Sequence, residues 1–114
     1  TTALICGWLA TALLVYMAFL YWRDPQNGLE QTTHRLESLP LVLANRYTAF
    51  AILGAAILLR GDLTLLAVFF AVSALMGLAD GWNYARSSLP HIKHTMSGVL
   101  AIIALIITLI ARAP

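Results

Sequence analysis

Polar and ionisable side chains gather where the third apolar segment ends and the fourth begins. Asp80 precedes Asn83 by three residues and Tyr84 by four, so the three side chains can share one face of a helix. His91 and His94 are three residues apart at the start of the next segment. A carboxylate beside an imidazole can exchange a proton or bind a polar ligand group, and two histidines with an aspartate resemble part of a metal site.

A metal site needs more ligands than this pattern supplies. Histidines at this spacing provide half of a zinc or non-haem iron site, and no second ligand set follows them. We therefore expect no metal and no other cofactor, and we expect His94 to bind Asp80 by a hydrogen bond instead. His34 with two nearby glutamates forms a weaker set, which we interpret as a solvated face.

The composition places these residues in a membrane protein. Hydrophobic residues make up 61% of the 114 residues and charged residues 11%, whereas soluble proteins carry roughly a quarter charged residues. Four apolar segments, at about 1–22, 39–59, 63–84 and 91–111, each reach the roughly 20 residues that a helix needs to cross a bilayer. The sequence predicts an all-α polytopic membrane protein, an antiparallel bundle of four transmembrane helices in a single domain 1–114, with a polar connection at 23–38.

Two opposite charges are expected at the same depth of this bundle. Arg46 follows Pro40 by six residues and Asp80 precedes Arg86 by six, which places both about 9 Å inside the apolar layer. The turn at 60–62 is so short that its flanking helices must be antiparallel neighbours. Because ionisable groups at this depth usually face the bundle interior, we expect Arg46 to pair with Asp80. The pair could serve binding or only helix packing, and the sequence leaves both open.

Small residues recur every three to four positions and predict where helices approach closely. One stripe, in the first segment, contains Ala3, Gly7 and Thr11. The others lie in the third and fourth segments, with members Ser73, Gly77 and Gly81, and Gly98, Ala101 and Thr108. We expect these stripes to pack against neighbouring helices. Asp62, just before the third segment, is expected to cap its first turn.

The distribution of basic residues predicts the orientation in the membrane. The net charge of +2 is too small to indicate a nucleic-acid partner. Most cationic residues flank the first and third connections, namely Arg23, Arg35, Arg86 and Lys93, with Arg46 deeper, against Arg60 and Arg112 at the other side. By the positive-inside rule both termini lie outside and these two connections are cytoplasmic.

The order of features from Asn45 onward resembles the DoxX-like group of small four-helix bacterial membrane proteins. The resemblance comes from Arg46 at the head of a span, the polar turn 60–62, the Ala-Asp-Gly-Trp sequence at 79–82 and His94 opening the last span. It covers about the last 70 residues. The resemblance implies a four-helix fold in the bacterial inner membrane with an inward Arg, Asp and His set, and it implies no particular reaction.

These observations predict a polar pocket at the cytoplasmic end of the bundle. Its expected ligand-binding residues are Arg46, Asp80, Asn83 and His94, lined by Tyr47 and Tyr84. The expected ligand is a small amphipathic or lipid-like molecule, and membrane lipid is the expected partner. The alternative is a structural accessory or assembly subunit of a larger membrane complex, and a homodimer is compatible with either. Acid–base catalysis on a lipid by Asp80 and His94 is a third hypothesis, so whether the protein is an enzyme stays open.

Overall fold

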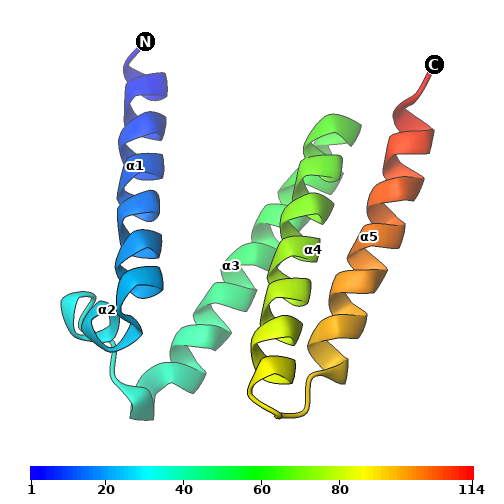
Figure 1. Ribbon diagram of the computed structural model, residues 1–114. Coiled ribbons are helices and arrows are strands. Elements are labelled where there is room, and N and C mark those ends of the chain that lie inside the picture. The colour runs from blue at the N-terminus through cyan, green and yellow to red at the C-terminus, as the bar shows by residue number, and fades with distance from the viewer. The chain divides into compact units, whose positions relative to one another are not determined.

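The computed structural model describes residues 1–114, which form helices and no strands. The elements are α1 (Thr2–Arg23), α2 (Pro25–Gln31), the 3-10 helix η1 (Leu36–Ser38), α3 (Leu39–Arg60), α4 (Leu63–Arg86) and α5 (Ile92–Arg112) (Figure 1). The predicted all-α fold is confirmed. The four predicted spans coincide with α1, α3, α4 and α5, and their bounds differ from the expected ones by a few residues at most.

The four long helices have the length and composition of membrane spans. Large apolar side chains point outward along them, including Trp8, which is 74% exposed, and Leu59, which is 91% exposed. A soluble protein would bury such side chains, whereas in a bilayer the lipid tails surround them. The chain is therefore an integral membrane protein.

The chain divides into two compact units, Thr1–Tyr47 and Thr48–Pro114. The first unit contains α1, α2, η1 and the beginning of α3. The second contains the rest of α3 with α4 and α5. The predicted assembly of all four spans into a single domain stays a prediction.

In the second unit, α4 and α5 pack side by side through glycines (Figure 1). Gly77 lies so close to α5 that a methyl group on it would come within 2.6 Å of the Gly98 backbone nitrogen. One on Gly81 would meet the Thr95 hydroxyl oxygen at 2.5 Å. Ala101 and Thr108 continue the buried face of α5. The two predicted small-residue stripes are thus the contact surfaces of one helix pair.

Short connections with specific backbone conformations join the helices of this unit. Gly61 has a φ of +74°, a conformation that costs residues with a side chain roughly 1–2 kcal/mol. The Asp62 side chain then accepts hydrogen bonds from the backbone N–H groups of Thr64 at 2.9 Å and Leu65 at 3.1 Å, as the sequence predicted. At the far end of the α4–α5 pair, Arg112 donates a hydrogen bond to the Thr64 hydroxyl at 2.9 Å. These contacts set the register of α4 against α5.

Aromatic stacking joins the second half of α3 to α4. The Phe50 and Phe69 rings stack with centroids 4.7 Å apart. Gly54 makes room for them, since an added methyl group would lie 2.9 Å from the Phe69 ring. A small apolar hollow of about 130 Å³ lies beside these rings. It is lined only by hydrocarbon side chains, and we assign it no chemistry.

Candidate functional site

The structure brings together three of the predicted site residues where α4 ends and α5 begins. The Asp80 Oδ2 and His94 Nδ1 atoms are 4.0 Å apart. The Tyr84 ring lies against the His94 ring, with centroids 4.8 Å apart and planes inclined by 36°. At 4.0 Å the two atoms are farther apart than in a hydrogen bond, so the predicted His94 to Asp80 hydrogen bond is not formed. The imidazole is therefore held between a carboxylate and an aromatic face.

The glycine contacts between the helices place these side chains. A methyl group on Gly77 would come within 3.0 Å of the His94 carbonyl oxygen, so the two backbones nearly touch one turn below the site. Asp80 and Tyr84, four residues apart, project from the same face of α4 toward His94. Both members of the ion pair keep access to the surroundings, with 37% of the His94 side chain and 53% of the Asp80 side chain exposed. The site is thus open to a ligand.

The remaining polar residues of this end have other partners. The His91 Nδ1 atom lies 3.0 Å from the Thr95 hydroxyl oxygen, and the His91 side chain does not cap a backbone N–H group at the start of α5. The Asn83 side-chain oxygen accepts a hydrogen bond from Arg86 at 3.2 Å. Asn83 is therefore at the correct end of α4 but is directed to Arg86. No three His, Cys, Asp or Glu side chains lie close enough together to hold a metal ion.

A surface hollow adjoins the ion pair at the start of α5. Its volume is about 420 Å³, and it is lined by Pro90, Ile92, Lys93 and His94. Two of these side chains carry nitrogen donors and two are apolar. His94 belongs to both features, because it is one of the residues that line the hollow and its Nδ1 atom lies 4.0 Å from Asp80 Oδ2. This shared residue connects the hollow to the polar cluster.

Arg46 and Tyr47, the other two predicted site residues, lie on α3 and are exposed. Both belong to the first unit, whereas Asp80 and His94 belong to the second. The predicted Arg46 to Asp80 pair would join the two units, and it stays a prediction.

A second polar cluster lies at the corner between α1 and α2, and the sequence did not reveal it. The Tyr21 hydroxyl oxygen is 2.6 Å from the Thr32 hydroxyl oxygen and 3.1 Å from the His34 Nδ1 atom. The Thr32 and His34 atoms are 2.7 Å apart, and the Thr32 hydroxyl also donates to the Gly28 carbonyl at 2.7 Å. We had interpreted His34 as part of a solvated face, but it is half-buried and hydrogen-bonded. Its partners hold α2 against the end of α1.

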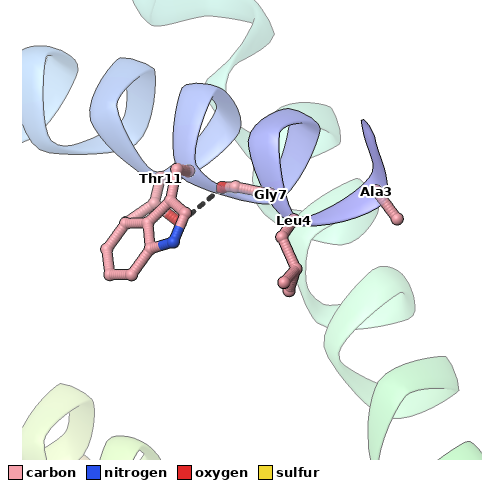
Figure 2. A pocket seen from close by; sticks show the side chains of 5 residues that line it. Ala3, Leu4, Gly7 and Thr11 are labelled. Atoms are coloured by element: carbon pink, nitrogen blue, oxygen red, sulfur yellow. Dashed lines mark hydrogen bonds between the residues drawn. The ribbon is translucent and has the colours of Figure 1, made fainter. Parts of the chain in front are cut away.

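The small-residue stripe of α1 lines a shallow hollow of about 290 Å³ (Figure 2). Ala3, Gly7 and Thr11 lie along one side of the helix, with Leu4 and Trp8 beside them. The Thr11 hydroxyl donates a hydrogen bond of 2.8 Å to the Gly7 carbonyl, so it needs no partner from another helix. The hollow presents an almost wholly apolar surface without a group that could do chemistry.

The chain matches no protein-family model, and comparisons with curated proteins and with solved structures found no match. The resemblance to the DoxX-like group stays an expectation from the sequence.

Proposed function

We propose that this integral membrane protein binds a small amphipathic or lipid-like molecule at the end of α4 and α5 that carries Asp80 and His94. The observation that carries the proposal is the position of His94, which lines a hollow of about 420 Å³ and lies 4.0 Å from Asp80. A polar group of a ligand in the hollow would meet the imidazole. The apolar part would lie along Pro90 and Ile92.

The chemistry of the cluster favours binding over a purely structural role. A charged side chain whose only role is to hold two helices together would be expected to lie in the contact face between them. There an oppositely charged partner could compensate for the water that the charge loses on burial. Asp80 and His94 instead border the contact face formed by Gly77 and Gly98, and both remain accessible. The glycines supply the packing, which leaves the ion pair free for another role.

The test is native mass spectrometry of the protein released from membranes in a mild detergent. Wild type is compared with His94→Leu, which removes the imidazole from the hollow. We expect a bound small molecule or lipid on the wild type, and an occupancy at least several-fold lower on His94→Leu because the ligand loses its polar contact.

His91→Leu is the matched control. It makes the same change three residues earlier, at a side chain that does not line the hollow. The control should keep the bound species. Equal retention in all three proteins, or a wild type that carries no small molecule, would contradict the proposal.

A structural accessory subunit of a larger membrane complex is the second candidate. It is favoured by α1, which has no buried residue and carries a small-residue stripe on its surface. In the same mass spectra this function predicts other protein chains bound to wild type and to His94→Leu alike. Gly7→Leu, which fills the stripe, should then release them.

We further propose a place and an orientation for the protein. The resemblance to the DoxX-like group supports the bacterial inner membrane. The excess of basic residues around the first and third connections supports both termini outside. In this orientation the Asp80 and His94 end faces the cytoplasmic leaflet.

A further inference from the structure

We infer that the ligand at this site carries a phosphate and is an anionic membrane lipid, whose headgroup binds Lys93 and His94. The inference rests on the proposed function and adds the chemical class of its ligand. It follows from which side chains line the hollow and which lie behind it.

The surface of the hollow is mostly apolar, its lining contains no acidic residue, and Lys93 is the one lining residue with a permanent charge. The Lys93 side chain has an ammonium group with three hydrogen-bond donors, and the His94 side chain has two ring nitrogens. Asp80 lies on the Nδ1 side of His94 and is not part of the lining. The carboxylate therefore orients the imidazole from one side, and the other ring nitrogen remains for a ligand.

A second cation reinforces this end of the helix pair. Arg86, in the last turn of α4, is held by the Asn83 side-chain oxygen at 3.2 Å. Only a short connection separates Arg86 from Pro90 and the first turn of α5. A phosphate at Lys93 would thus lie in a region where positive groups outnumber the single carboxylate of Asp80.

The apolar part of the lining fits the rest of a lipid. Ile92 is 65% exposed, and Pro90 lies beside it on the wall of the hollow. These side chains can contact the glycerol and the first methylenes of an acyl chain while the phosphate meets Lys93. A choline headgroup would bring its own cation close to the Lys93 ammonium group, so a zwitterionic lipid should bind less well than phosphatidylglycerol.

The experiment is a competition in detergent micelles, read by native mass spectrometry. The full-length protein is mixed with equal amounts of dioleoyl-phosphatidylglycerol and dioleoyl-phosphatidylcholine. Wild type should retain phosphatidylglycerol in preference. Lys93→Gln should lower the retention of phosphatidylglycerol about fivefold, the effect expected for one lysine at an anionic lipid surface.

Two variants separate this contact from a general effect of charge. Arg60→Gln removes one positive charge from the last turn of α3, beside the Gly61 turn that precedes α4, and should leave the preference unchanged. Lys93→Arg keeps the charge and should restore most of the binding. Lys93 is an exposed residue in the first turn of α5, and circular dichroism of each variant checks that the helices are intact.

The outcomes distinguish the inference from the proposed function beneath it. If both lipids bind equally and His94→Leu releases both, the site is real and its predicted selectivity for an anionic headgroup is wrong. If no lipid is retained, the proposed function fails. If glycerol 3-phosphate displaces phosphatidylglycerol as well as the intact lipid does, the site recognises a soluble phosphate and the lipid assignment is overturned.

Discussion

Gly77 and Gly98 have no side chain at the point where α4 and α5 come closest. The atoms that a Gly77 methyl group would meet are the backbone nitrogen and Cα of Gly98, at 2.6 and 2.7 Å. Backbone atoms cannot rotate away as the end of a side chain can. The close approach of the helices therefore depends on the absence of one carbon atom.

Gly77→Ala should lower the free energy of unfolding by about 1–3 kcal/mol, the usual cost of overpacking a contact that cannot relax. The measurement is reversible unfolding by sodium dodecyl sulfate in mixed micelles, followed by circular dichroism. Gly7→Ala is the matched control, because a methyl group there meets nothing within 4 Å. It should leave stability unchanged or raise it slightly, since alanine favours a helix over glycine. A destabilisation equal to that of Gly77→Ala would show that the contact is not the cause.

Among the elements, the corner between α1 and α2 is fixed by side chains as much as by backbone. Asp24 separates the helices in an extended conformation, and its side chain accepts a hydrogen bond from the Asn27 N–H. Gly28 is buried against the Tyr21 ring. A methyl group added to Gly28 would lie 2.9 Å from an atom of this ring. The triangle of Tyr21, Thr32 and His34 then closes the corner.

Tyr21→Phe should loosen this corner without altering α1 itself. The change removes the two polar contacts that the half-buried Tyr21 hydroxyl makes. The loss of one hydrogen bond lowers stability by about 0.5–1.5 kcal/mol. Amide hydrogen exchange of residues 28–34 should therefore become roughly two- to tenfold faster. Tyr16→Phe is the control on the same helix, because Tyr16 is 56% exposed and its hydroxyl has no hydrogen-bond partner in the chain. Equal exchange in the two variants would show that the triangle does not hold α2.

For the whole molecule, four spans predict that both termini lie on the same side of the membrane. Single cysteines in a Cys6→Ala background test this together with the orientation. Ser88→Cys and Gln26→Cys should resist a membrane-impermeant maleimide added to intact cells, because the proposed orientation places both connections in the cytoplasm. Arg60→Cys, in the second connection, should be labelled. The reversed pattern would overturn the orientation, and labelling of Gln26→Cys but not Ser88→Cys would contradict the number of spans.

The helices could be predicted because their cause is local. A run of about 20 apolar residues must satisfy its backbone hydrogen bonds within itself in a bilayer, and each of the four runs does so as a helix. The cap at Asp62 and the glycine stripes of α4 and α5 are equally local, since they follow from single residues and from helical spacing. The neighbourhood of Asp80 and His94 follows from these stripes and a short connection.

Two features depended on the tertiary structure. The triangle at the α1–α2 corner forms because α1 ends at Arg23 and the extended Asp24 redirects the chain, which brings Tyr21 beside residues that no helical spacing relates to it. The partner of His94 was predicted, but its distance was not, because the separation of two helices depends on side-chain packing over their whole length. The sequence alone thus determined where each apolar helix begins and ends. Packing between the helices decided which polar atoms meet and at what distance. The energy of a contact changes over fractions of an ångström, and residue spacing in the sequence does not specify interatomic distances that finely.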